Sequence, residues 1–228
     1  ISSVEKHFPG VEVAAAGHRV VHGGNDFDGP VLINDEVLAK LESLIKLAPL
    51  HQPHNLSGIY AAIENFPAIP QIACFDTAFH RTQEFENRAF ALPYRFYEEG
   101  IVRYGFHGLS YDYINTEVAR IAPELHQGKV VVAHLGNGAS LCAIENGKSK
   151  ASTMGFTVLD GLPMGTRCGQ LDPGILLHFI ETEGLSVDEV SHMLYYESGL
   201  LGLSGGLSND MRTLSEAGTE EGARAINY

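Results

Sequence analysis

The feature that most restricts the fold of this chain is the alternation of short apolar runs, rich in β-branched residues, with longer amphipathic segments. Strands are expected in residues 11–24, as one strand or two short ones, and in residues 70–80 and 128–136. Helices are expected in residues 34–48, 55–66, 110–122, 173–184 and 186–199, and again from Asn209 onward. Strands that alternate with helices in this way predict an α/β fold.

Local signals support two of these elements in detail. In residues 34–48, apolar side chains recur at helical spacing on one face, and Asn34 or Asp35 can cap the first turn. The residues of that face are Val37, Leu38, Leu41, Leu44, Ile45 and Ala48. Residues 140–153 predict a β-hairpin, because Asn146-Gly147 is a favoured two-residue turn.

Composition narrows the class of protein. The 228 residues are 44% hydrophobic, enough for a substantial core, and no apolar run approaches the roughly 18 to 20 residues that span a bilayer. The formal net charge of −13 argues against a nucleic-acid partner, which needs a basic face, but permits a small anionic ligand. The chain starts at Ile1 without a basic and apolar leader, and we expect it to be a segment of a longer protein.

The cysteines indicate the redox environment. There are three, Cys74, Cys142 and Cys168, and they are too few and too widely spaced for a disulfide framework or a CxxC metal site. Cys74 and Cys142 lie within apolar strand segments, where they are expected as small core residues. This usage favours a reducing compartment, and we expect a cytoplasmic protein.

The stretch VVVAHLGNGAS, residues 130–140, joins an apolar strand to side chains with almost no bulk. Backbone N–H groups in such a stretch can approach a ligand closely, and phosphate is the usual guest. A second interpretation is a tight hairpin turn, since Asn-Gly is a common turn pair. The stretch alone leaves both interpretations open.

Polar side chains gather where the predicted strands end, which is where ligands bind in α/β folds. Arg19 follows the first strand, Asp76 follows the second, and His134 lies at the end of the third. His107 lies between a phenylalanine and a glycine, and Arg167 lies in a loop rich in glycine and proline. Acids, histidines and arginines beside glycines indicate anion binding and group transfer.

Each of these residues also has a plain structural interpretation. His18 and His22 have the i, i+4 spacing of a zinc pair, but on a strand that spacing separates them by about 13 Å. Asp76 can cap a following helical turn, and the two arginines can be surface residues. His54 and His80 lie in no comparable context, and we expect them to be structural.

Seven motifs, taken in order, resemble the acetate kinase family. They are GHRVVHGG, LAPLHQPHNLSGI, FDTAFH, RYGFHGLS, VVVAHLGNGAS, STMGFTVLDGLPMGTRCGQLDPG and SGLLGLSGGLSNDMR, and they cover the chain from Val11 to Arg212. The resemblance implies an α/β fold in which two related domains of the actin-like ATPase (ribonuclease H-like) type flank a nucleotide cleft, incomplete here at both ends. Residues 1–78 would be part of the N-terminal, substrate-side domain, and residues 79–228 part of the C-terminal, nucleotide-binding and dimerising domain.

The resemblance also implies a reaction. It is the reversible transfer of the γ-phosphoryl group of ATP to acetate by direct in-line displacement, giving acetyl phosphate and ADP. Mg²⁺ is the implied cofactor, with Mn²⁺ as an alternative, and its ligands are expected outside this segment, which by itself is expected to be inactive. The implied partners are acetate, ATP or ADP, and a second copy in a homodimer, with no nucleic acid and no membrane.

Site residues follow by the same resemblance. The implied catalytic residues are Arg19, His51, Asp76, His107 and Arg167. The arginines would hold the carboxylate and the transferring phosphoryl group, and His107 would stabilise the transition state. Asp76 is better interpreted as a positioner than as a general base, because acetate is already ionised at neutral pH. The implied substrate pocket comprises Arg19, Val21, Leu50, Phe106 and Val158. The implied nucleotide contacts are His134, Leu135, Gly136, Asn137, Gly138, Asp210, Met211 and Arg212.

The chain departs from the family's pattern at several positions. Val158 stands where the family usually has a proline, Leu109 and Tyr111 replace a common threonine and histidine, and Met211 replaces a frequent aromatic residue. The change at Val158 leaves a propionate or butyrate kinase of the same family as an alternative, since one methylene in an apolar pocket is worth only about 1–3 kcal/mol. Two further alternatives are a non-catalytic fragment that binds nucleotide or carboxylate and a metallohydrolase built on the histidines.

Overall fold

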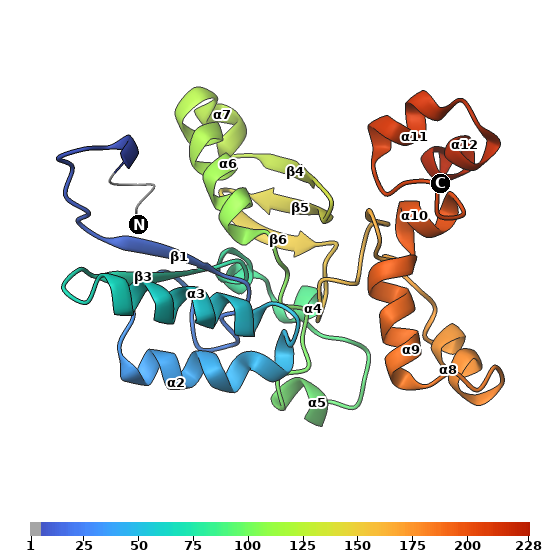
Figure 1. Cartoon of the computed structure of the whole chain (residues 1–228), viewed down its shortest axis with the longest axis horizontal. Helices are drawn as coiled ribbons and strands as arrows, with labels where there is room; N and C mark the ends of the chain where they lie inside the picture. The colour runs from blue at the N-terminus through green and yellow to red at the C-terminus, as the bar shows by residue number, and fades with distance from the viewer. Residues whose placement is uncertain (1–5) are drawn as a thin grey trace.

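The computed structural model describes residues 6–228, which form two three-stranded sheets followed by a group of helices (Figure 1). The first sheet has the order β1-β3-β2. Its strands are β1 (Ala16–Val20), β2 (Val31–Leu32) and β3 (Gln71–Phe75), with β1 parallel and β2 antiparallel to β3. Of the expected strand segment 11–24, only the five residues that pair with the five of β3 are a strand, and the short β2 was not predicted.

Helices α2 (Asp35–Ser43) and α3 (Gln52–Asn65) lie side by side along the first sheet (Figure 1). Asn34 is the cap of α2, because its side chain accepts a hydrogen bond from the backbone N–H of Val37 at 2.9 Å. The helix expected to reach residue 48 ends at Ser43 and continues as the 3₁₀ helix η1 (Leu44–Leu47). The core beneath these helices consists of Val20, Leu41, Leu56, Ile59, Ala73 and Phe75.

The second sheet is antiparallel, with the order β4-β5-β6. Its strands are β4 (Lys129–Leu135), β5 (Ala139–Glu145) and β6 (Lys148–Ser152). Asn146 and Gly147 both have positive φ at the turn between β5 and β6, as favoured hairpin turns require, so the predicted hairpin is confirmed. Helices α6 (Gly108–Ile121) and α7 (Pro123–His126) precede the sheet and lie beside it (Figure 1).

Short helical turns that the sequence did not predict connect the two sheets. They are η2 (Ala78–Thr82), α4 (Phe85–Arg88) and α5 (Arg95–Glu98). Each has only four or five residues, too few to show a hydrophobic period. Because η2 packs against β6 and α6, it ties the end of β3 to the second sheet.

The C-terminal part is helical, as predicted. Its elements are α8 (Pro173–Glu181), α9 (Val187–His192), the π-helical η3 (Met193–Glu197), α10 (Gly199–Leu203), α11 (Met211–Ala217) and α12 (Glu220–Asn227). A capping box between Ser186 and Glu189 starts α9. Figure 1 shows these helices set apart from α2 and α3, beyond the long loop that follows β6. No helix within residues 6–228 has both the length and the apolar character needed to cross a bilayer.

Of the two cysteines expected in the core, Cys142 lies there and Cys74 is only partly buried. Cys142 is fully buried in the core of the second sheet with Tyr111 and Ile144, and burial raises its pKa to about 11. Cys74 on β3 is half-buried. All three thiols are free.

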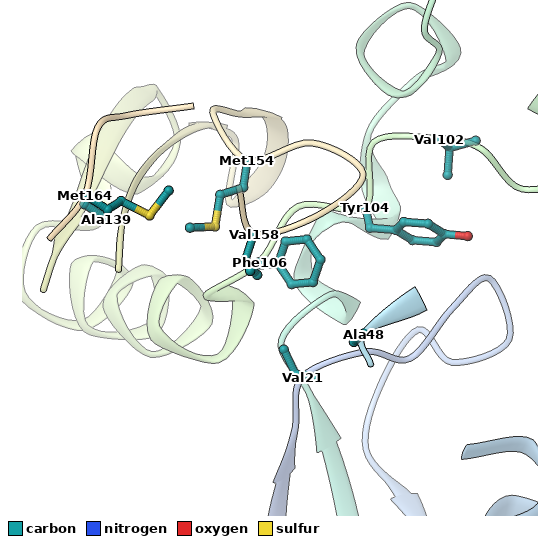
Figure 2. Close-up of a cluster of buried hydrophobic side chains, with 9 residues drawn as sticks. All are labelled: Val21, Ala48, Val102, Tyr104, Phe106, Ala139, Met154, Val158 and Met164. Carbon is teal, nitrogen blue, oxygen red and sulfur yellow. The ribbon is translucent and has the colours of Figure 1, made fainter. Parts of the chain in front are cut away.

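A separate hydrophobic cluster lies where the end of β1, residues 102–106 and the long loop meet (Figure 2). Its buried members are Val21, Ala48, Val102, Tyr104, Phe106, Ala139, Met154, Val158 and Met164. Figure 2 shows the ring of Phe106 close to Val158. Burial of these side chains holds segments far apart in sequence together, and the candidate site lies along the edge of this cluster.

Candidate active site

Arg19 and Asp76 form a two-point ion pair at the ends of β1 and β3. The Arg19 Nη2 and Nε atoms donate to Asp76 Oδ2 at 2.7 and 3.0 Å, and Nε also lies 3.2 Å from Oδ1. The pair exists because parallel neighbouring strands end at the same edge, and the backbone N–H of Asp76 still donates to the Val20 carbonyl at 3.0 Å. Asp76 is therefore not a helix cap: the cap position of η2 is held by Thr77, which makes no side-chain capping hydrogen bond.

Burial and charge act in opposite directions on this carboxylate. Asp76 is only 2% exposed, and burial raises its pKa, while the guanidinium of Arg19 opposes the rise. The Asp76 side chain in turn raises the pKa of Arg19. A two-point contact between guanidinium and carboxylate holds Arg19 in one orientation at the mouth of the site.

The segment from Tyr104 to Gly108 is pressed against the end of β3. The backbone N–H of Gly108 donates to the Asp76 carbonyl at 2.7 Å, and a Cβ at Gly108 would lie only 2.2 Å from that oxygen. His80 is fully buried, and its Nε2 donates to the Phe106 carbonyl at 2.9 Å, so the structural interpretation of His80 holds. Between these anchors His107 adopts a left-handed backbone conformation, with φ of 59°, at the start of α6.

His107 and His134 stack on each other. Their ring centroids are 4.0 Å apart with an interplanar angle of 19°, and His134 Nδ1 lies 2.9 Å from the hydroxyl of Ser110. Burial, followed by the nearby His134, Arg19 and Arg167, lowers the pKa of His107 to about 3. His107 is therefore a neutral imidazole at physiological pH.

Residues 136–138 form the turn between β4 and β5, so the hairpin interpretation of this stretch is confirmed. The turn also borders the site. A Cβ at Gly138 would lie 3.1 Å from Arg167 Nη2 and 3.4 Å from His107 Nε2. The carbonyl of Asn137 accepts from the backbone N–H of Gly165 at 3.1 Å, which connects the turn to the long loop. Gly138 thus lets the turn approach a guanidinium and an imidazole closely, because a side chain at this position would crowd both.

Arg167 is the second arginine of the site. Its Nη1 donates to the Val158 carbonyl at 2.9 Å, and no carboxylate within residues 6–228 forms an ion pair with it. Burial lowers its pKa. A half-buried guanidinium without a carboxylate partner is suited to bind an anion.

A cavity of about 240 Å³ opens next to these groups. Four of the expected substrate residues, Val21, Leu50, Phe106 and Val158, line it together with His51. Burial, followed by the charges of Arg167 and Arg19, lowers the pKa of His51. The structure therefore gathers the expected apolar substrate residues around one pocket. Its other lining residues are Lys46, Leu47, Ala48, Pro49, Phe156, Thr157, Ser191 and Tyr195.

Some of the expected nucleotide residues stand apart from this centre. Leu135 is 75% exposed, and the Asp210 carboxylate caps α11 by accepting from the backbone N–H of Thr213 at 2.8 Å. Met211 and Arg212 lie on the exposed first turn of α11. One link to the turn exists: the Asn209 side chain lies 3.4 Å from Asn137 Oδ1.

Two residues at the site were not singled out as functional from the sequence. Ser140 lies 2.8 Å from His107 Nδ1, and the hydroxyl of Tyr111 lies beside Ser140. The available signal was weak: Ser140 ends the glycine-rich stretch, and Tyr111 is a departure from the family's pattern. The hydrogen-bond partner of a hydroxyl cannot be read from the sequence when the two residues are far apart in the chain.

The residues described here do not suggest a metal site. Within residues 6–228 no group of three or more His, Cys, Asp or Glu side chains could hold a metal ion. His18 Nε2 lies 2.7 Å from Gln71 Oε1, and His22 Nδ1 accepts from the backbone N–H of Gly24. The zinc interpretation of these two histidines is therefore wrong.

Comparisons with known proteins agree with the motifs. The profile of the Acetokinase family matches residues 4–228. The acetate kinase of Methylocella silvestris is 61% identical over 97% of this chain and 54% of its own length. The acetate kinase of Nitrobacter hamburgensis is 55% identical over 94% of this chain and 53% of its own. The chain spans about half the length of the curated relatives it matches.

Solved structures show the same fold. A propionate kinase from Francisella tularensis superposes with a TM-score of 0.93 at 42% identity, covering 99% of this chain and 59% of its own. Porphyromonas gingivalis acetate kinase superposes with a TM-score of 0.88 at 42% identity, covering 95% of this chain and 55% of its own. These neighbours confirm the expected α/β fold class of the actin-like type. On both its sequence and its fold, this chain belongs to the acetokinase family.

Proposed function

We propose that the protein containing this chain transfers the γ-phosphoryl group of ATP to acetate, giving acetyl phosphate and ADP, and catalyses the reverse reaction. One observation carries the proposal. The guanidinium of Arg167, which pairs with no carboxylate within residues 6–228, and the Nε2 atom of His107 both lie next to Gly138. Arg19 is close enough to influence the same imidazole, and the small apolar pocket lies adjacent.

The charges fit a reaction between two anions. A carboxylate and a phosphoryl group repel each other, so a catalyst must neutralise charge and align the reacting atoms. Arg167, which has no carboxylate partner among residues 6–228, is assigned to the transferring phosphoryl group. His107 is neutral and is assigned as a hydrogen-bond donor to the charge that develops in the transition state.

On the carboxylate side, Asp76 is assigned to hold Arg19 in place, and Arg19 to bind the acceptor carboxylate. No general base is required, because the acceptor is ionised at neutral pH. His51 is assigned next to the path of the phosphoryl group, since its pKa responds to both arginines. The methyl group of acetate would enter the pocket among Val21, Leu50, Phe106 and Val158.

A second candidate is a kinase of the same type that prefers propionate or butyrate. The cavity of about 240 Å³ extends from the apolar residues toward Lys46 and Tyr195, which leaves space beyond a methyl group. Val158 replaces the family's usual proline at this pocket. A solved relative of this fold carries the name propionate kinase.

The nucleotide side of the proposal rests on the turn at residues 134–138 and on Asp210, Met211 and Arg212. Mg²⁺ or Mn²⁺ is included as the cation that accompanies ATP. The described residues do not supply its ligand set, because Asp76 is occupied by Arg19 and no cluster of potential metal ligands exists within residues 6–228. The proposal also includes a cytoplasmic homodimer, with residues 1–78 on the substrate side and residues 79–228 on the nucleotide side.

The test uses the full-length protein that contains this chain. The protein is supplied with Mg-ATP and acetate, propionate or butyrate, and any acyl phosphate is trapped with hydroxylamine. The strongest product from acetate supports the first candidate. The strongest product from a longer acid supports the second. No product from folded protein with any acid contradicts both and favours a binding role without transfer.

A further inference from the structure

We propose that Ser140 and Tyr111 are positioning residues, which together hold His107 in the tautomer that carries its proton on Nε2. The inference rests on the proposed function only for its consequence, since it explains how His107 comes to donate a hydrogen bond into the site. The tautomer itself is a property of this chain's own hydrogen bonds.

Three groups form a chain behind the imidazole. Ser140 Oγ lies 2.8 Å from His107 Nδ1 and 2.5 Å from the Tyr111 hydroxyl. Ser140 and Tyr111 are both fully buried, and His107 is only 9% exposed. Water therefore does not reach the two hydroxyl groups, and their protons must go to protein acceptors.

The donors and acceptors that are available determine which group donates in each of these two hydrogen bonds. Burial raises the pKa of Tyr111 to about 12, against smaller opposing effects of Ser140 and the His134 backbone N–H, so the phenol keeps its proton. A backbone N–H can only donate, which leaves Ser140 Oγ as the acceptor for the phenol proton. The Ser140 hydroxyl must then donate its own proton to His107 Nδ1. A neutral imidazole that accepts at Nδ1 carries its proton on Nε2.

The reverse direction leaves a buried donor without a partner. If His107 Nδ1 donated to Ser140, either the Tyr111 proton or the Ser140 proton would have no acceptor among the described contacts. An unsatisfied buried donor costs about 1–3 kcal/mol. That difference is enough to make the Nε2-protonated tautomer predominate at least about fivefold.

The proton faces the position where the proposal places the phosphoryl group. A Cβ built on Gly138 would lie 3.4 Å from His107 Nε2 and 3.1 Å from Arg167 Nη2. An Nε2–H donor and a guanidinium therefore lie next to the same glycine. The opposite tautomer would present a lone pair there, which repels an anionic oxygen.

Packing holds Tyr111 and Ser140 in place, so the Tyr111–Ser140–His107 relay of hydrogen bonds is rigid. Tyr111 lies in the first turn of α6 and packs with Cys142 and Ile144, and its ring meets that of His80 at 5.7 Å and 73°. Ser140 is the second residue of β5, immediately after the glycine-rich turn. These hydrogen bonds thus connect α6, which begins directly after His107, to the strand that follows the turn.

The experiment uses the full-length protein with ¹⁵N-labelled histidine. Ring nitrogen shifts separate a protonated from an unprotonated nitrogen, and the His107 signals are assigned by their loss in His107→Gln. In the unmodified protein we expect an unprotonated Nδ1 and a protonated Nε2. In Ser140→Ala we expect the Nδ1-protonated form to appear, with kcat at least about tenfold lower and KM for the carboxylate within about twofold.

Two more variants test whether the hydroxyls act as one chain. Tyr111→Phe leaves Ser140 free to donate or accept, so we expect a smaller shift toward the other tautomer and a smaller loss of kcat. In the double variant the loss should match that of Ser140→Ala alone, because the tyrosine acts through the serine. Tyr104→Phe is the matched control: it removes another buried phenol, which donates to the Gly100 carbonyl at 2.8 Å. It should change neither the tautomer nor kcat.

The outcomes that overturn the inference are separate from those that overturn the proposed function. A protonated Nδ1 in the unmodified protein, or an unchanged tautomer in folded Ser140→Ala, contradicts the relay. Absence of acyl phosphate in the unmodified protein contradicts the proposed reaction, while the nitrogen shifts still decide the tautomer. A tautomer that follows Ser140 with no change in kcat supports the hydrogen-bond chain and overturns its catalytic task.

Discussion

The two arginines of the candidate site differ in whether their positive charge is neutralised by a carboxylate. At the strand ends, Arg19 and Asp76 form a two-point ion pair, so this region carries no net charge from the pair. In the loop after β6, Arg167 donates to a backbone carbonyl and pairs with no carboxylate within residues 6–228. The strand-end region therefore positions a cation, whereas the loop region leaves a positive charge available.

The difference has a consequence for stability. A half-buried charge without a partner costs free energy, and burial lowers the pKa of Arg167 accordingly. An anion bound beside Gly138 would recover that cost, and the recovery is binding energy for catalysis. Arg19, which is paired with Asp76, would orient an anionic ligand but attract it less strongly than Arg167. The following substitutions test this contrast in the full-length protein.

Arg167→Ala should have the largest effect. We expect the fold to persist and kcat/KM for acyl phosphate formation to fall about 10³- to 10⁵-fold, the range for arginines that stabilise a transferring phosphoryl group. The melting temperature should be unchanged or higher, because an uncompensated charge is removed. The hydroxamate assay and thermal unfolding measure both. Arg167→Lys, which keeps the charge but loses the fork, is the control, and near-normal turnover in Arg167→Ala would show that this arginine is misassigned.

Asp76→Asn should separate positioning from stability. The amide has the shape of the carboxylate but loses the charge-assisted contact, so Arg19 is less firmly held and kcat/KM should fall about 10²-fold. The free energy of unfolding should change by less than about 1 kcal/mol, because burial already disfavours the charged form of Asp76. Urea titration and steady-state kinetics give the two values. A stability loss as large as the catalytic loss would mean that the pair mainly holds the fold.

Gly138→Ala should affect the loop region alone. Its new Cβ would enter the space beside Arg167 Nη2 and His107 Nε2, and we expect kcat/KM to fall about tenfold with little change in stability. Gly58→Ala is the matched control, because a Cβ on that exposed position of α3 meets no atom within 4 Å. It should stabilise the protein by about 0.5–1 kcal/mol and leave turnover unchanged. Equal loss in both variants would contradict a ligand position beside Gly138.

The last test concerns the pH dependence of stability, which does not involve turnover. Burial lowers the pKa to about 4 in His22, beside the strand-end region, and in His80, beneath Phe106. An unfolded histidine binds a proton near pH 6.5 and the folded one does not, so stability is complete above pH 6.5 and is lost as pH falls toward 4. Each histidine contributes up to about 1.4 kcal/mol per pH unit in this window. Urea titrations at pH 7 and pH 5 measure the slope, and His80→Gln should reduce it by one histidine's share. An unchanged slope would mean that His80 titrates normally.

Much of the local structure could be predicted because its causes are local. Asn34 caps α2 and Asn146-Gly147 turns the second hairpin, and both depend on residues within a few positions. The positions of Arg19 and Asp76 at strand ends could also be inferred, but the parallel pairing that brings them together could not. The short turns between residues 78 and 98 could not, because packing between the sheets determines them rather than any periodicity.

By itself, the sequence determined the family and the fold class, and it predicted the charged and glycine-rich residues of the candidate site. Only the tertiary structure decided that Asp76 meets Arg19 instead of capping a helix, and that Ser140 and Tyr111 stand behind His107. The reason is the range of the forces involved. Hydrophobic periodicity and turn preferences act within a few residues, whereas these ion pairs and hydrogen bonds join side chains 29 to 57 positions apart and form only near 3 Å.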